Sequence, residues 1–250
     1  MIYFELAMLQ RTVVIFDCES DGGPAGGDFS KVQCTCACAI VCSSEDVLKA
    51  CGDPSLVDTM LSPSVDVSKR ITCWRDVCDE GYNPFHNLFL AFDSAEAIVA
   101  HNGLDFDFPL LRKHYGKSNE AQQRYMAHRF KTLDCFNVIR SLTGGWIALN
   151  TILRNNKLSS KTGDGRDAIK WWCDGQRSKL RAYCFKDVEL TARVCLLPKM
   201  VLPGVGNVPT HLYSIASFLA SLRFSPTAEA ETDWLVVSSP AQSTGSGSSE

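Results

Sequence analysis

Residues 12–20 read TVVIFDCES, a β-branched and aromatic run that predicts a strand ending at Asp17. Asp17 and Glu19 lie two residues apart, so in an extended chain their side chains project to the same side. Adjacent carboxylates repel one another, and this raises their pKa values unless a cation holds them ionised. The glycine-rich turn that follows, DGGPAGG at 21–27, lets a ligand approach the backbone. The alternative to a ligand site is an exposed, acidic strand end.

The rest of the chain predicts strands and then helices around this first strand. Further strands are predicted at 31–43, 69–75 and 97–100. Helices are predicted at 84–93, 108–115, 133–142, 149–158, 179–197 and 210–223, and a polar loop at 159–167. This order indicates an α/β fold in which a mixed sheet is flanked by helices. Sheets of that kind bind ligands at the ends of their strands.

A second acidic segment, HNGLDFDFPLL at 101–111, leaves the strand at 97–100 and enters a helix. Asp107 falls at the start of that helix, where its carboxylate either caps the helix or faces the strand end. Asp105 competes with Asp107 as the residue that carries chemistry.

The third segment is YCFKD at 183–187. Tyr183 and Asp187 are spaced i, i+4, so on a helix they share one face. Leu180 and Thr191 lie on the same face, which otherwise belongs to a core. A carboxylate and a phenol buried in a core need hydrogen-bonding or charged partners. A metal ion bound at the carboxylates would satisfy both groups.

The net charge of −3 over 250 residues conceals an uneven distribution. Residues 108–186 carry 16 Lys and Arg against 5 Asp and Glu, whereas the remainder carries 9 against 23. Such a division suits a protein that uses a few carboxylates for chemistry and a basic surface for polyanions. Solvated helix faces are the alternative. We expect no membrane span and no signal peptide, and hence an intracellular protein of the cytoplasm or nucleus.

Twelve cysteines are present without a CxxC pair, which disfavours a zinc-ribbon site. Cys34, Cys36 and Cys38 alternate, so in a strand all three should leave from one face. Buried, reduced thiols are the favoured interpretation, and a metal or redox role is the alternative. A protein based on cysteine chemistry would leave the carboxylates unexplained.

The segments FDCES, HNGLDFDFPLL and YCFKD, in this order, resemble the three motifs of the DEDD superfamily of 3′→5′ exonucleases. The Y-x-x-x-D spacing is similar to the tyrosine (DEDDy) branch, because the histidine branch would have His where this chain has Ala182. LDCFNVIRSL at 133–142 and Gly-Asp-Gly at 163–165 extend the resemblance, which covers about 13–194. The first motif departs from the usual pattern by ending in Ser20 rather than Thr.

The resemblance implies a ribonuclease H-like fold and a metal-dependent 3′→5′ exonuclease. Such an enzyme hydrolyses the last phosphodiester bond of single-stranded DNA or RNA and releases nucleoside 5′-monophosphates. It implies two Mg²⁺ or Mn²⁺ ions held by Asp17, Glu19, Asp107 and Asp187. Tyr183 would orient the attacking water or help to deprotonate it, and its ordinary pKa near 10 favours orientation. The residues expected to bind substrate are Asn102, Phe106 and Lys161. Trp171 and Trp172 either stack on bases or belong to the core.

The expected organisation is an exonuclease domain at 11–202, a C-terminal helical extension at 203–224 and a disordered, low-complexity tail at 225–250. The alternative function is a catalytically inactive nucleic-acid-binding module on the same fold. The presence of all four carboxylates and the tyrosine favours the enzyme.

Overall fold

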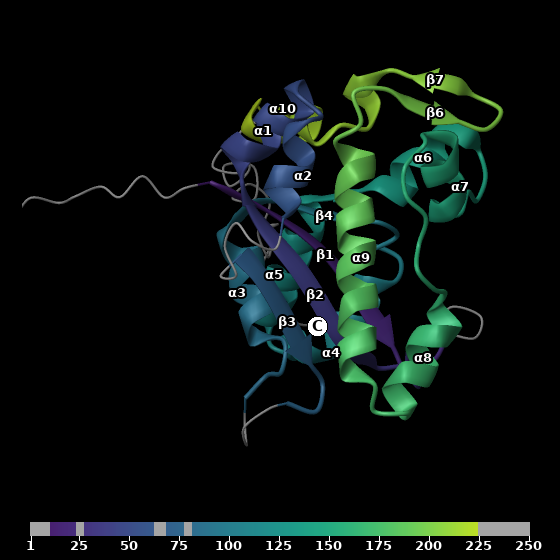
Figure 1. Cartoon of the computed structure of the whole chain (residues 1–250). Coiled ribbons are helices and arrows are strands. Elements are labelled where there is room, and N and C mark those ends of the chain that lie inside the picture. The colour runs from purple at the N-terminus through teal and green to yellow at the C-terminus, as the bar shows by residue number, and fades with distance from the viewer. Residues whose placement is uncertain (1–10, 24–27, 63–68, 78–81, 225–250) are drawn as a thin grey trace, which may run out of the picture.

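A five-stranded mixed sheet lies at the centre of the computed structural model, which describes residues 11–23, 28–62, 69–77 and 82–224 (Figure 1). Its strand order is β3-β2-β1-β4-β5. The strands are β1 (Thr12–Ser20), β2 (Cys34–Ser43), β3 (Arg70–Trp74), β4 (Ala95–Ala100) and β5 (Thr132–Asp134). Strand β1 pairs antiparallel with β2 and parallel with β4. The predicted α/β fold, a mixed sheet flanked by helices, is thus confirmed.

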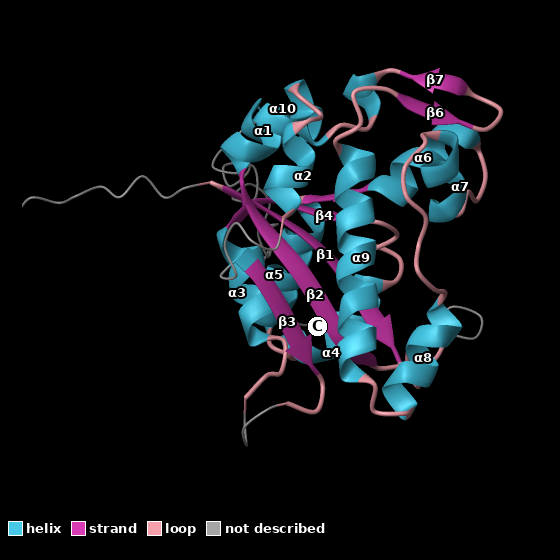
Figure 2. Ribbon diagram, viewed as in Figure 1, coloured by secondary structure: helices cyan, strands magenta, loops and turns pink. Residues whose placement is uncertain are grey.

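Helices cover both faces of the sheet (Figure 2). The longest, α9 (Arg177–Cys195), packs against β1 and β2 on one face. The opposite face is covered by α3 (His86–Ser94), α4 (Asp107–Tyr115) and α5 (Asn119–Phe130). The remaining helices are α1 (Ser44–Gly52), α2 (Leu56–Leu61), α6 (Cys135–Thr143), α7 (Leu149–Asn155), α8 (Gly165–Cys173), the short 3-10 helix η3 (Thr210–Leu212) and α10 (Ile215–Phe224). A hairpin of β6 (Met200–Leu202) and β7 (Gly206–Val208) follows α9.

Strand β1 is the central strand because both of its faces are apolar. Val13 and Ile15 pack under α9, whereas Val14 and Phe16 pack against the aromatic layer formed with α3 and α4. Strand alternation therefore assigns Asp17 and Glu19 to the α9 side, and Cys18 to the other.

Two sequence predictions about elements are corrected. Residues 132–134 pair with β4 as a short strand, so the helix predicted over 133–142 begins only at Cys135. Asp134 caps that helix, since its carboxylate accepts hydrogen bonds from the N–H groups of Phe136 and Asn137. Helices α1, α2, α5 and α8 were not predicted, although Ser43, Ser118 and Asp164 cap three of them.

The three alternating cysteines do not share one face. Cys36 and Cys38 lie under α9, but Cys34 packs in the opposite layer with Cys18. The register between β1 and β2 shifts between Glu19 and Ser20, where Thr35 is passed over. This extra residue reverses the alternation and turns Cys34 to the other face.

Two expectations from the sequence concern the ends of the chain and the membrane. The tail predicted at 225–250 lies outside the described residues. Within the described part, no helix is long and apolar enough to cross a membrane.

Candidate active site

Two strand ends and two helices meet at one edge of the sheet. Strands β1 and β4 are parallel, so their carboxyl ends lie at the same edge. Asp17 and Glu19 come from the end of β1, on the face covered by α9. Glu19 is buried, and Asp17 is half-buried.

Asp107 reaches this edge from the first turn of α4. Its Oδ1 accepts a hydrogen bond of 2.7 Å from the backbone N–H of Cys18, which lies between Asp17 and Glu19. Of the two orientations considered for Asp107, the carboxylate therefore takes the one that faces the strand end. Asp105, the competing candidate, is exposed and lies 3.5 Å from the guanidinium of Arg140.

Helix α9 contributes the third segment. Tyr183 and Asp187 are one turn apart and both are buried. Leu180, Cys184 and Val188 fix this stretch of the helix in the core beneath the sheet. The i, i+4 spacing therefore places the phenol and the carboxylate over the end of β1.

The four carboxylates act on one another electrostatically. Burial raises the pKa of Asp17 well above its usual value, and the charges of Asp107 and Asp187 raise it further. Burial and then the charges of Asp17 and Asp187 likewise raise the pKa of Glu19. Burial raises the pKa of Asp107 to about 7, although the hydrogen bond from Cys18 acts in the opposite sense. Raised pKa values of this kind are typical of carboxylates whose ionised forms need a bound cation to balance their charge.

One ammonium group lies among these carboxylates. Lys161 forms an ion pair with Asp187, and its Nζ lies 3.5 Å from the hydroxyl of Tyr183. Burial would lower the pKa of Lys161, but Asp187 and Asp17 raise it above its usual value. Burial raises the pKa of Asp187 despite this partner. Lys161, which the sequence analysis expects to bind substrate, thus lies against a carboxylate of the cluster.

The donor set fits a hard divalent cation. Asp187 Oδ1 is buried and has no hydrogen-bond partner within the described part of the chain. Asp17, Glu19 and Cys184 offer ligand atoms that all lie within 4.8 Å of one another. Carboxylate oxygens are the ligands that Mg²⁺ and Mn²⁺ prefer. Four carboxylates outnumber the ammonium of Lys161 that pairs with one of them, so negative charge is left to be balanced.

The loop between β4 and α4 is held by Asp134, a residue that the sequence reasoning missed. Asp134 Oδ1 accepts from the N–H of Asn102 at 2.9 Å, and Oδ2 accepts from the N–H of Leu104 at 2.8 Å. Asn102 is half-buried and has a left-handed backbone with φ of 67°. A Cβ on Gly103 would lie 2.4 Å from that of Ala100, so this turn requires glycine. The sequence did contain a signal for Asp134, because this aspartate ends a strand and caps the helix that follows.

Phe106 precedes Asp107 and is half-buried. Its ring meets that of Phe29 edge-on, with centroids 5.8 Å apart. Phe29 also lines a hollow of about 750 Å³ whose wall includes Arg112, Lys113 and Lys117. Phe106 therefore stands between the carboxylate cluster and a basic hollow.

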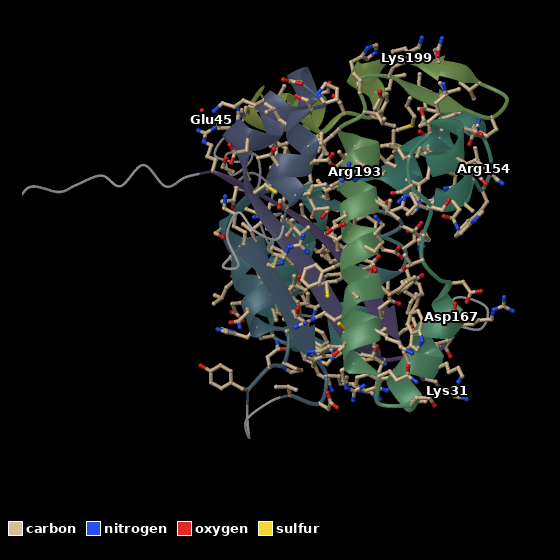
Figure 3. All side chains as sticks on the ribbon, viewed as in Figure 1. Lys31, Glu45, Arg154, Asp167, Arg193 and Lys199 are labelled. Atoms are coloured by element: carbon tan, nitrogen blue, oxygen red, sulfur yellow. The ribbon has the colours of Figure 1, made fainter. Side chains whose placement is uncertain are left out.

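The Gly-Asp-Gly loop packs over Tyr183. A Cβ on Gly163 would lie 3.1 Å from Trp171 and 3.5 Å from the Tyr183 ring. Asp167 on α8, labelled in Figure 3, accepts a hydrogen bond of 3.0 Å from the N–H of Asp164 and closes this loop. Trp171 meets Tyr183 edge-on, with centroids 5.6 Å apart. These contacts set the position of the phenol.

Trp172 is half-buried and packs against the core, with two guanidinium groups beside its ring. The guanidinium of Arg177 lies 3.5 Å from the centroid of its ring, and that of Arg75 lies 4.9 Å away.

The exposed aromatic residue near the site is one that the sequence reasoning did not single out. Trp146 is 71% exposed, and its ring lies 4.3 Å from that of Phe136. Phe136 in turn contacts His101, 5.6 Å between centroids. Burial and the nearby charge of Lys161 lower the pKa of His101 to about 3, so this imidazole stays neutral.

Comparison with known proteins does not assign the chain to a family. No family model matches the chain, and no curated protein matches it. Among solved structures, it is similar to the family B DNA polymerase of the hyperthermophilic archaeon Pyrobaculum calidifontis. The TM-score is 0.47 at 15% sequence identity, over 74% of this chain and 24% of the polymerase. The chain thus corresponds to about a quarter of that polymerase.

Proposed function

We propose that the chain is a metal-dependent 3′→5′ exonuclease that releases nucleoside 5′-monophosphates from single-stranded DNA or RNA. The observations that support this proposal are the grouping of Asp17 and Glu19 within 4.8 Å of Cys184 and the charges of Asp107 and Asp187, which lie near enough to raise the pKa of Asp17. Lys161 pairs with Asp187 beside the hydroxyl of Tyr183. The residues 11–202 would form the catalytic unit, and 203–224 an extension that packs back on it through α10. We assign the protein to an intracellular compartment.

The four carboxylates would hold two Mg²⁺ or Mn²⁺ ions. Bound ions of this kind stabilise negative charge on the scissile phosphate and on its leaving oxygen. The carboxylate of Asp107 is held in place by the N–H of Cys18, and that of Asp187 by the rigid helix α9. The unpartnered Oδ1 of Asp187 is the oxygen that a cation would satisfy.

Tyr183 would orient the attacking water through its hydroxyl group. Burial and the charges of Asp187 and Glu19 raise the pKa of the phenol, so it stays protonated. A protonated phenol donates or accepts a hydrogen bond but is a poor base, and orientation is therefore its role. Lys161, 3.5 Å from the hydroxyl, would turn toward the scissile phosphate when substrate enters.

The substrate strand would follow basic and aromatic side chains around the cluster. One hollow is lined by Arg112, Lys113 and Lys117. Phe29 also lines it, and the Phe29 ring contacts that of Phe106. Trp146 offers an exposed ring on which a base can stack. Asn102 lies on the loop that leads to Asp107 and would contact the terminal nucleotide. Binding through phosphates predicts strong salt dependence.

A second candidate function is a catalytically inactive nucleic-acid-binding module. The ion pair between Lys161 and Asp187 favours it, because an internal ammonium already neutralises one carboxylate of the cluster. The two functions differ in whether the bound strand is shortened.

The deciding experiment uses single-stranded DNA and RNA oligonucleotides labelled at the 5′ end. We expect a ladder of shortened strands with Mg²⁺ or Mn²⁺ and none with chelator. Asp17→Asn should abolish the ladder, whereas the matched control Asp105→Asn, an exposed carboxylate outside the cluster, should keep it. Binding of intact strands without shortening would support the inactive module.

A further inference from the structure

Three thiols meet beside the carboxylate cluster. Cys36 and Cys38 on β2 and Cys184 on α9 are buried, and their Sγ atoms all lie within 4.8 Å of one another. The register of the sheet explains the juxtaposition, because Cys38 lies directly opposite Asp17, and Cys36 opposite Glu19. Opposite residues of an antiparallel pair point to the same face. We refer to these three cysteines as the thiol triad.

The spacing of the triad suits a tetrahedral thiophilic ion. Zinc–sulfur bonds of about 2.3 Å place two sulfur ligands about 3.8 Å apart. The Sγ atoms of Cys36 and Cys38 are 3.8 Å apart. A sulfur and a carboxylate oxygen on the same ion would be separated by about 3.6 Å, and Cys184 Sγ lies 3.8 Å from Asp17 Oδ2. Asp17 therefore offers a carboxylate oxygen at a fitting distance from Cys184, although it is not grouped with Cys36 and Cys38 within 4.8 Å.

Packing alone does not account for this grouping. Cys42 lies on the same strand and in the same buried layer as Cys36 and Cys38, yet it takes no part in the group. Among the residues that the structure describes, two groups of three or more metal-ligating side chains come together, and Cys184 belongs to both. The thiol triad and the carboxylate pair of β1, Asp17 and Glu19, thus lie side by side, and Cys184 is common to both groups.

We infer that Cys36, Cys38 and Cys184, with Asp17 on the side of Cys184, form a site for a thiophilic divalent cation of the Zn²⁺ and Cd²⁺ class, which shares Asp17 with the proposed Mg²⁺ sites. An ion enters from the side of Asp17, which is half-buried whereas the triad is buried. Occupation commits the Asp17 carboxylate and so inhibits hydrolysis. This inhibition rests on the proposed exonuclease function, but the binding of the ion does not.

Cadmium is the probe, because its bonds to thiolates give an ultraviolet charge-transfer band that carboxylates do not give. We expect the reduced full-length chain to show this band on titration with Cd²⁺. Cys36→Ala should weaken binding about 10-fold or more, and Cys36→Ser serves where the alanine variant does not fold. The matched control is Cys42→Ala, which should leave the band and the affinity unchanged.

Two results overturn the site: no thiolate band in the wild-type chain, or a band that Cys36→Ala and Cys42→Ala reduce equally. A second arm measures Mg²⁺-dependent nucleotide release against added Zn²⁺, with each variant compared with its own rate in Mg²⁺ alone. Zn²⁺ should inhibit the wild type and Cys42→Ala at about 10-fold lower concentration than Cys36→Ala. Equal inhibition of all three would contradict coupling through Asp17. A wild-type chain that releases no nucleotide refutes the exonuclease, while the cadmium band still decides the thiol site.

Discussion

Asp107 accepts a hydrogen bond from the backbone N–H of Cys18 at 2.7 Å, across 89 positions of sequence. This contact connects the second acidic segment to the first. Because Cys18 stands between Asp17 and Glu19, it fixes the carboxylate of Asp107 against the strand that carries the other two. The cluster is therefore assembled by backbone geometry as well as by side-chain placement.

The first prediction concerns the stability of the metal-free chain. Asp17→Asn removes a half-buried charge that repels Asp107 and Asp187, so it should raise the free energy of unfolding at pH 8 by about 1 kcal/mol. The same variant should gain less thermal stability from added Mn²⁺ than the wild type. Thermal unfolding with and without Mn²⁺ measures both. Asp105→Asn is the control, and an Asp17→Asn variant that is less stable without metal would contradict the account.

The second prediction concerns the phenol. Tyr183→Phe should lower kcat about 10- to 100-fold, because the water loses the hydroxyl that orients it. Affinity for Mn²⁺ should change little, since the tyrosine is not proposed as a ligand. Single-turnover kinetics and calorimetric Mn²⁺ titration separate the two effects. Tyr82→Phe, at an exposed ring, is the control; an unchanged rate in Tyr183→Phe would remove the phenol from the mechanism.

The third prediction concerns the loop that carries Asn102. In Gly103→Ala, the new methyl group would lie 2.4 Å from the Cβ of Ala100, so the loop must shift. We expect a loss of about 1–3 kcal/mol of stability and a fall in nucleotide release. Gly52→Ala adds a methyl group in open space and serves as the control. Chemical denaturation of both variants tests this, and equal stabilities would show that the turn tolerates a side chain.

The fourth prediction concerns pH and a histidine remote from the site. His128 lies between the Tyr115 hydroxyl and Asp93, at 2.7 and 2.8 Å. Burial lowers the pKa of His128 to about 4, although Asp93 acts in the opposite sense, and the cations Lys131 and Arg124 lower it further.

The sign of the effect follows from this lowered pKa. Below an unfolded pKa of about 6.5 the unfolded chain binds a proton that the folded chain refuses, so stability falls between pH 6.5 and 4. His128→Gln should flatten this part of the curve of unfolding free energy against pH. His211→Gln, at an exposed position, should not. A wild-type curve that is flat over this interval would contradict the assignment.

Local pattern was sufficient to predict the parts of the site that lie on single elements. The strand that ends at Asp17, the helix that starts near Asp107 and the shared face of Tyr183 and Asp187 all follow from periods of 2 and 3.6 residues. Their meeting depends on the parallel pairing of β1 with β4 and on the packing of α9. No single segment encodes that pairing, and it was the resemblance of the three segments, in this order, to the exonuclease motifs that implied it.

Other features depend on contacts that sequence periodicity does not contain. Passing over Thr35 in the ladder reverses the alternation, so Cys34 left the face predicted for it. Asp134 acts on a loop 30 residues earlier in the chain. The ion pair of Lys161 with Asp187 likewise joins a polar loop to a helix through the folded structure.

The central claim is that Asp17, Glu19, Asp107 and Asp187 together bind divalent ions. Calorimetric titration of Mn²⁺ into the chain tests it directly. We expect saturable binding of two ions per chain, with at least one lost in Asp17→Asn and in Asp187→Asn and both kept in Asp105→Asn. A wild-type chain that shows no saturable binding, or variants that bind as the wild type does, would contradict it.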